Sequence, residues 1–356
     1  MKKISTLLTI ILVTVFTVKA TVLTVSNNSN SPGQYTSLQA AIDAAYDGDT
    51  ILVAGSSTSY GDIDINHPLT IIGAGYHNPY GNNSILGYVD FIRVNADNSA
   101  SGSFISGFDV YQFRFYGSFS GGDINTQGID DVTVERCWFD NIYFGSSSSS
   151  YSNDTVRNCI VITLIDFYYY TSSLFDNIVI HNNIFNGSNI EGNNSIDLST
   201  CYLRNNLFID KTTSVFSDVK NMVLENNIFY KAEPTGCSGC TFNNNLTYYN
   251  SNNTIPYGDN GGSGNIVDDD PEFVNYPVTG GAFDWAHDFH LEEATSPAIG
   301  TGTSGNDIGI YGLPLPYEVG DNPRIPQMIE ITFQNGVSSV EKGGDLNVNF
   351  KAKKQD

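Results

Sequence analysis

The chain has little positive charge and few charged residues of any kind. Only 15% of its 356 residues are charged, and 38 Asp and Glu stand against 16 Lys and Arg, so the formal net charge is −22. Such a chain offers no basic surface for the counterion release that drives binding to phosphate backbones. We therefore expect no nucleic-acid partner.

Cysteines are also scarce, which excludes a small domain held together by disulfides. The chain is long enough for one large domain with an appendage. An odd number of cysteines leaves at least one thiol without an intramolecular partner. Cys137 and Cys159, in adjacent repeats, could form a bridge or remain small buried thiols. Cys237 and Cys240 form a CxxC that could be a local bridge, which we favour, or half of a metal site. The fifth cysteine is Cys201.

Sequence signatures of several enzyme classes are missing. We find no Ser/His/Asp constellation, no phosphate-binding Gly loop and no zinc signature. Strong helix formers are few, whereas the chain contains 39 Asn, 34 Gly, 21 Tyr and 21 Phe. This composition is typical of many short strands joined by tight turns, and it predicts an all-β fold.

Long hydrophobic runs are absent except at the N-terminus. Lys2 and Lys3 precede an apolar run over residues 4–18, and Val18-Lys19-Ala20 follows with small residues at its outer positions. This pattern predicts a secretory signal peptide over residues 1–20 and no membrane span in the mature chain. Its removal would take the net charge from −22 to −22 − 3 = −25. We expect a secreted, periplasmic or outer-surface protein.

One short phrase recurs through the middle of the chain: an apolar residue, any residue, Asn, Asn, an aliphatic residue and Phe. It occurs with drift at residues 134–139, 156–161, 180–185, 203–208, 224–229 and 242–247. The second Asn, or the Cys that replaces it, therefore recurs after 22, 24, 23, 21 and 18 residues. This period is too short for propeller blades, and the leucine skeleton of leucine-rich repeats is absent.

A repeat of about 22 residues predicts a solenoid whose coils each contain three short strands and three turns. Stacked coils pair each strand with its equivalent in the next coil, about 4.8 Å away, so equivalent side chains form ladders. Asn suits such a turn because it tolerates left-handed backbone geometry. Its amide can also hydrogen-bond to the Asn of the neighbouring coil, which satisfies groups that would otherwise be buried and unpaired.

The N-terminal part of the expected solenoid begins with a helix. Residues 36–45 show an amphipathic pattern with a Thr or Ser cap, and we expect strands at 50–53, 63–65 and 69–75. The open end of a solenoid exposes apolar interior and unpaired strand edges. The helix is therefore expected to cap the first coil.

These patterns together resemble a known family. The segments that carry the resemblance are residues 37–53 and 69–75, the Asn-Asn coils, Asp270-Pro271-Glu272-Phe273-Val274-Asn275, Phe289-His290-Leu291, Ser296-Pro297-Ala298-Ile299-Gly300 and Asp307-Ile308-Gly309-Ile310-Tyr311-Gly312. They resemble the bacterial secreted right-handed parallel β-helix proteins of the pectate-lyase-like superfamily over residues 21–312. The resemblance implies that fold and an interaction with polysaccharide. Its members include pectate and alginate lyases, polysaccharide hydrolases and proteins that serve only in surface display.

The sequence changes character after residue 312. Residues 313–326 contain Pro314, Pro316, Pro323 and Pro326, and alternating patterns over 329–333 and 346–350 predict two strands. Such a short segment rarely forms an independent core. We expect residues 313–356 to be a Pro-rich linker and a small β appendage.

One outward-facing row of the coils contains most of the candidate catalytic residues. Strand alternation predicts that the second residue of each phrase points outward, and the row reads Glu135, Arg157, His181, Arg204 and Glu225. Arg157 or Arg204 would bind a carboxylated sugar or act as a base, and His181 would be the general acid or base. Glu135 or Glu225 would supply a second carboxylate or a cation ligand. The alternative is a ladder of ion pairs with no catalytic role.

Other candidates lie outside this row. Asp268, Asp270 and Glu272 carry the oxygen ligands that Ca²⁺ prefers. Consecutive Asp side chains cannot all face one ion, however, so a solvated loop is the favoured interpretation. Alternation along residues 167–170 would display either Tyr168 and Tyr170 or Phe167 and Tyr169 for stacking on sugars, and we take Tyr168 and Tyr170 as the candidates. Ca²⁺ is the one cofactor that the sequence suggests, since it could bridge this acidic protein to a polyuronate.

The sequence therefore predicts a secreted or surface-displayed β-helix protein that interacts with a polysaccharide or cell-surface glycan. A lyase or glycoside hydrolase would use the outward row. A non-catalytic glycan-binding, adhesive or structural protein would need only exposed aromatic and polar side chains.

Overall fold

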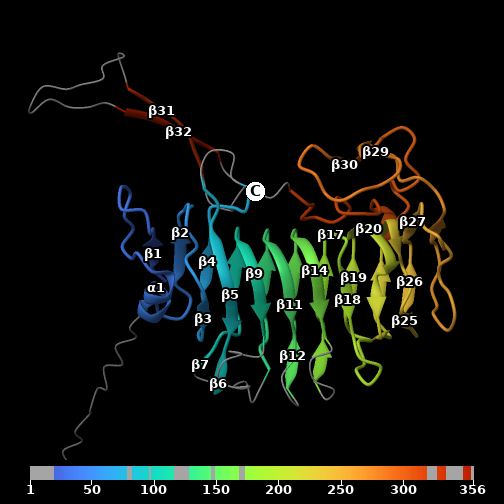
Figure 1. Cartoon of the computed structure of the whole chain (residues 1–356), viewed down its shortest axis with the longest axis horizontal. Coiled ribbons are helices and arrows are strands. Elements are labelled where there is room, and N and C mark those ends of the chain that lie inside the picture. The colour runs from blue at the N-terminus through green and yellow to red at the C-terminus, as the bar shows by residue number, and fades with distance from the viewer. Residues whose placement is uncertain are drawn as a thin grey trace, which may run out of the picture.

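A computed structural model describes residues 20–77, 82–95, 98–115, 128–145, 149–167, 173–318, 327–333 and 348–353. The predicted signal peptide, except Ala20, lies outside these residues, as do Tyr168 and Tyr170. Within the described residues the chain is an all-β parallel solenoid of about 9 coils (Figure 1). The fold class and the resemblance to parallel β-helix proteins are thus confirmed.

Two long parallel sheets run the length of the solenoid, and consecutive strands of each sheet come from consecutive coils. Sheet A is made of β1 (Val22–Val25), β2 (Thr50–Val53), β4 (Thr70–Ile72), β8 (Phe104–Ser106), β10 (Thr133–Glu135), β13 (Thr155–Arg157), β16 (Val179–His181), β19 (Tyr202–Arg204), β23 (Val223–Glu225) and β26 (Thr241–Asn243). Sheet B is made of β3 (Ile63–Ile65), β5 (Ile85–Phe91), β9 (Asp109–Arg114), β11 (Trp138–Tyr143), β14 (Ile160–Asp166), β17 (Ile184–Asn186), β20 (Leu207–Ser214), β24 (Ile228–Glu233), β27 (Leu246–Tyr248) and β28 (Ile266–Val267), with β18 (Asn189–Glu191) and β21 (Phe216–Ser217) beside this path.

Smaller elements complete the described chain. Helix α1 (Leu38–Ala44) begins after Ser37, whose hydroxyl accepts a hydrogen bond from the Ala40 amide, and its apolar face packs against β1, β2 and β3. Two-stranded sheets pair β12 (Ser150–Ser152) with β15 (Leu174–Asp176), β22 (Val219–Lys220) with β25 (Cys237–Ser238), β6 (Arg93–Asn95) with β7 (Asn98–Ser99), β29 (Phe273–Asn275) with β30 (Asp288–Leu291), and β31 (Gln327–Phe333) with β32 (Val348–Lys353); a 3₁₀ turn, η1, covers Thr303–Gly305.

The two Asn of the repeated phrase form the tight turn between sheets A and B, and they have different roles. The first residue of each pair has a left-handed backbone, with φ between 49° and 56° at Arg136, Asn158, Asn182, Asn205, Asn226 and Asn244. The second Asn points into the solenoid, where the Asn183 amide N–H donates to Oδ1 of Asn206 (3.0 Å) and that of Asn206 donates to Asn227 (2.9 Å). The predicted Asn ladder is therefore present.

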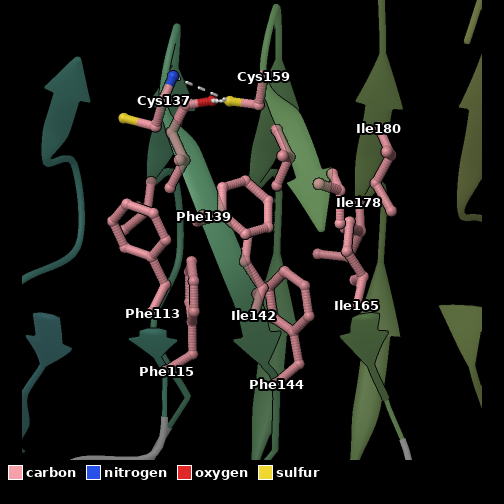
Figure 2. Close-up of a cluster of buried hydrophobic side chains, with 14 of the residues drawn as sticks. Phe113, Phe115, Cys137, Phe139, Ile142, Phe144, Cys159, Ile165, Ile178 and Ile180 are labelled. Atoms are coloured by element: carbon pink, nitrogen blue, oxygen red, sulfur yellow. Dashed lines mark hydrogen bonds between the residues drawn. The ribbon is translucent and has the colours of Figure 1, made fainter. Parts of the chain in front are cut away.

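Two cysteines continue this ladder toward the N-terminus. The Cys159 amide donates to Oδ1 of Asn183 (2.9 Å), and the Cys137 amide donates to the Cys159 sulfur (3.4 Å). Figure 2 shows the two cysteines on neighbouring coils. Both thiols are free and buried, as are the other three cysteines. The Cys159 sulfur thus replaces an amide oxygen as acceptor.

The solenoid interior is a stack of apolar and aromatic side chains (Figure 2). The first residue of each phrase and its Phe both face this core. The rings of Phe208 and Phe229 stack at 4.9 Å between centroids, and Phe185 stacks on Phe208 at 4.3 Å. In-register aromatic pairs of this kind stabilise a sheet beyond the area they bury.

The aliphatic residue of each phrase lies on the opposite, outer face of sheet B. Ile160, Ile184, Leu207, Ile228 and Leu246 are in register and all fully buried. The cover is the segment after β28, which contributes side chains such as those at 289, 298, 308 and 310 to the same cluster. This explains why an outward position of the repeat is always apolar.

The segment 298–318, here named the C-terminal arm, is fixed to the first-Asn row. Asn182 donates to the Ile310 carbonyl (2.6 Å), Asn205 donates to the Gly309 carbonyl (2.9 Å), and Asn226 Oδ1 accepts from the Thr303 amide (2.9 Å). Arg136 pairs with Glu318 at 2.9 Å. The arm therefore runs back along the solenoid, one coil at a time.

Candidate functional site

The predicted outward row exists as a row in register on sheet A. Glu135 lies opposite Arg157, Arg157 opposite His181, His181 opposite Arg204, and Arg204 opposite Glu225. Arg157, His181, Arg204 and Glu225 are partly exposed, whereas Glu135 is fully buried. Glu135 lies beside Arg136, which is buried and pairs with Glu318 of the C-terminal arm.

Both arginines of this row are neutralised by glutamates on neighbouring coils. The Nε and Nη2 atoms of Arg157 donate to Oε2 of Glu135 at 2.9 and 2.7 Å. Arg204 Nε lies 2.8 Å from Oε2 of Glu225, and its guanidinium stacks 3.9 Å above the Tyr202 ring. This arrangement matches the ion-pair ladder that the sequence left as an alternative.

His181 lies between the two arginines and differs from them in charge. Burial is the main cause that lowers its pKa below the usual value of 6.5, and Arg157 and Arg204 act in the same direction. Its Nδ1 lies 2.6 Å from Oδ1 of Asn182. The imidazole is therefore neutral at neutral pH, which is the form that a general base requires.

A second polar row, absent from the sequence predictions, lies on the outer face of sheet B. Asp64, Asp90 and Arg114 are in register on three successive coils. Arg114 binds Asp90 through two hydrogen bonds, with Nη2 2.6 Å from Oδ2, and lies 4.0 Å above the Tyr88 ring. Burial raises the pKa of Asp90 to about 6 despite this pairing. The charges of Asp90 and Arg114 are satisfied within the protein, as on sheet A.

A third group, also missed from the sequence, combines aromatic rings with carboxylates on the outer face of sheet B. Asp109 lies opposite Trp138, and the register on either side places Tyr111 opposite Asp140. The Tyr88 ring contacts Tyr111 edge-on at 5.3 Å, and Trp285 approaches Trp138 at 5.7 Å. We name this surface the aromatic–carboxylate platform: Tyr88, Asp109, Tyr111, Trp138, Asp140 and Trp285.

The platform is open to solvent at two rings. Tyr111 is 50% exposed and Trp285 37% exposed, which places both among the large apolar side chains that remain accessible. Trp285 is held from the other side by His77, whose ring stacks on it at 3.7 Å. The Tyr76 ring packs against both indoles, at 6.3 Å from Trp138 and 6.0 Å from Trp285. The exposed rings are therefore held in place by other rings.

The two carboxylates of the platform have no partner among the residues that the structure describes. No Lys, Arg or His there lies within ion-pair distance of Asp109 or Asp140, and no hydrogen bond to either carboxylate is formed. Burial raises the pKa of both groups, and the charge of Asp140 raises that of Asp109 further. Unpaired, half-buried carboxylates are unfavourable for folding and are a common mark of a binding site.

The remaining predicted residues are not brought together. Asp268 accepts a hydrogen bond from Asn253 (2.7 Å), and Asp270 accepts one from the Glu272 amide (2.9 Å). No three His, Cys, Asp or Glu side chains gather as a metal-binding set in the described part of the chain. None of the helices described there is long and apolar enough to cross a membrane.

Comparison with known proteins gives likeness of fold without a sequence relative. No family model and no curated protein sequence matches the chain. An alginate lyase from Paenibacillus sp. str. FPU-7 shares 14% identity over 69% of this chain and 99% of its own, with a TM-score of 0.38. The pectate lyase Pel9A shares 14% identity over 81% of this chain and 95% of its own, with a TM-score of 0.37. A pectin methylesterase from Aspergillus niger shares 15% identity over 68% of this chain and 85% of its own, with a TM-score of 0.31. The solenoid itself rests on the strand pairings of this chain, and the activities belong to those enzymes.

Proposed function

We propose that the protein is a polysaccharide-binding β-solenoid that acts outside the cytoplasm, and that the aromatic–carboxylate platform is its contact surface. The observation that carries this proposal is the pairing of two exposed rings, Tyr111 and Trp285, with two carboxylates that have no partner in the described chain. Aromatic rings stack on the apolar faces of sugars, and carboxylates accept hydrogen bonds from hydroxyl groups. Together they form the usual mixed lining of a saccharide site.

The geometry of sheet A argues against a catalytic site on that sheet and so favours a binding protein over an enzyme. A guanidinium that acts as a base or binds a substrate carboxylate must be available, and both arginines of the row are already paired with glutamates. Glu135 is fully buried, so it has no access to a substrate. The row therefore contributes to the stability of neighbouring coils.

One observation supports a second candidate, a polysaccharide lyase at sheet A. His181 is a neutral, partly exposed imidazole with a guanidinium on the coil below and another on the coil above. A base flanked by two cations is suited to removing a proton next to a carboxylate. In this candidate a polyuronate would displace Glu225 from Arg204, the more exposed of the two arginines.

A single panel of polysaccharides separates the two candidates. Mature protein is incubated with neutral, amino-bearing and uronate polymers, with and without Ca²⁺, and both binding and unsaturated uronate product are measured. Binding without product, lost in Trp285→Ala and retained in His181→Ala, supports the proposal. Product that disappears in His181→Ala establishes the lyase instead. Absence of binding and of product rejects both candidates.

A further inference from the structure

The platform also indicates which class of glycan it binds, and this inference rests on the proposed function. Two side chains of like charge lie on adjacent strands of one face, on β9 and β11, and the register places them one coil apart. Like charges so close repel each other, and no cation of the described chain lies near enough to compensate them. The site therefore has net negative charge that a ligand can neutralise.

The aromatic rings next to the carboxylates favour a cation as well. The faces of Trp and Tyr rings attract ammonium groups through the ring quadrupole, and Trp does so most strongly. Trp138 lies opposite Asp109, and Tyr111 lies opposite Asp140, so each carboxylate has a ring beside it. A ring and a carboxylate together provide apolar contact for a pyranose and a counter-charge for an amino group on it.

The net negative charge of the whole chain also favours a cationic ligand. A formal net charge of −22 repels polyuronates and attracts cationic polymers over distances of about a Debye length. A neutral sugar would fill the apolar part of the platform but would leave both carboxylates without a counter-charge. A glycan that carries primary amines satisfies the rings and the carboxylates at once.

We propose that the ligand of the platform is a glycan with free amino groups, such as a de-N-acetylated hexosamine polymer. Its ammonium groups pair with Asp109 and Asp140, and its sugar rings pack on Tyr111 and Trp285. N-acetylation removes the charge of the ligand and adds bulk, so the acetylated form of the same polymer binds more weakly.

The chain offers its own probe for this site. It contains two Trp, and both belong to the platform. Intrinsic Trp fluorescence therefore reports ligand binding there with little background from the rest of the molecule. Oligomers of glucosamine and of N-acetylglucosamine with equal length are titrated separately, together with an oligouronate in the presence and absence of Ca²⁺.

We expect the glucosamine oligomer to bind at least tenfold more tightly than its acetylated counterpart. Asp109→Asn and Asp140→Asn should each remove most of this difference, because each should weaken binding of the glucosamine oligomer far more than binding of the acetylated oligomer. Glu225→Gln, which removes a carboxylate from sheet A, is the matched control and should not alter the difference.

Other outcomes overturn the inference in distinct ways. Equal affinity for the two oligomers means that the amine is not recognised, while the proposed binding function stands. Binding of the oligouronate only with Ca²⁺, lost in Asp109→Asn, would mean that the carboxylates hold a cation for an acidic glycan. If no saccharide of the panel alters the fluorescence or binds by calorimetry, the proposed function fails and the inference fails with it.

Discussion

The charged row of sheet A and the platform of sheet B differ in how their charges are balanced. On sheet A, Arg157 and Arg204 each hold a glutamate from a neighbouring coil, and the charges of Glu135, Arg157, Arg204 and Glu225 cancel. On the platform of sheet B, Asp109 and Asp140 lie on neighbouring coils without a cation in the described residues. Stacking of the coils thus pairs opposite charges on sheet A, which stabilises the fold, and places like charges together at the platform, where a ligand could neutralise them.

This difference shows that position alone does not identify a functional row in a solenoid. Any outward position becomes a ladder, because each coil repeats the register of the last. A ladder with alternating charges is satisfied by itself. A ladder of like charges, or of charges beside exposed rings, has no counter-charge of its own, and a ligand can supply it.

The largest expected effect is on sheet A, from Glu135→Gln. The substitution removes the fully buried carboxylate that pairs with Arg157, whereas Arg136 keeps its pair with Glu318. Breaking a buried ion pair of this kind lowers the free energy of unfolding by about 3 kcal/mol. Urea unfolding followed by circular dichroism measures the loss. Glu225→Gln breaks a more exposed pair, at about 1 kcal/mol or less, and equal losses in the two variants would contradict the assignment.

The next effect concerns binding and compares one ring on each face. Trp285→Ala removes an exposed anchor of the platform, which should weaken glycan binding by about 2 kcal/mol, roughly thirtyfold. The unfolding midpoint should also fall, because Trp285 packs against Tyr76, His77 and Trp138, so binding is measured at a temperature where the variant is fully folded. Tyr202→Ala on sheet A is the matched variant. A loss of binding in Tyr202→Ala alone would move the site to sheet A.

A smaller effect is expected on the pH dependence of stability when the two platform carboxylates are replaced. The pKa values of Asp109 and Asp140 are raised in the folded protein, so their ionisation costs stability as pH rises through the window that begins near 3.8. Replacing both by Asn should stabilise the protein at pH 7 by less than about 1 kcal/mol, because solvent screens the partly exposed groups. At pH 3 the gain should vanish.

A control carboxylate should behave in the opposite way. The pKa of Asp197 is lowered, chiefly by its hydrogen bond from Asn221. Its ionised form is therefore favoured by folding, and Asp197→Asn should lose a small amount of stability at pH 7. A loss of stability in the Asp109/Asp140 double variant at pH 7 would show that these groups have partners.

The smallest effect is at His181. Its pKa is lowered by burial, so the unfolded chain binds the proton more readily, and stability is lost as pH falls below about 6.5. His181→Asn should remove this part of the pH dependence between pH 7.5 and 5, an effect below about 1 kcal/mol. An unchanged pH profile in His181→Asn would mean that the imidazole does not titrate in this range.

The repeated phrase predicted the fold because each of its positions has one physical task. The core positions, the left-handed position and the ladder position could all be inferred from residue type, since Asn, Phe and aliphatic residues suit those tasks. Only the structure shows that the first Asn of each pair takes the left-handed position, from its backbone angle, and that the second Asn forms the ladder, from its hydrogen bonds. The aliphatic position remained unexplained, because its cover comes from residues after 270.

The site was harder to predict for the same reason. Trp138 and Trp285 are in contact although 147 positions separate them in the sequence. Trp285 lies outside the repeated phrase, so the repeat could not predict this contact. The pair of Arg136 with Glu318 likewise joins residues that are far apart in the sequence. A local signal existed at the platform: the first phrase has Trp138 where later phrases have an aliphatic residue.

The C-terminal arm changes how the solenoid must fold. A stack of coils that contact only their neighbours can form and fray one coil at a time. Here Asn226, Asn205 and Asn182 bind residues 77, 104 and 128 positions later in the chain, so the middle coils are joined through distant contacts. Closing such long loops slows folding and makes opening more cooperative. During synthesis, the aliphatic row of sheet B stays uncovered until residue 310 has left the ribosome.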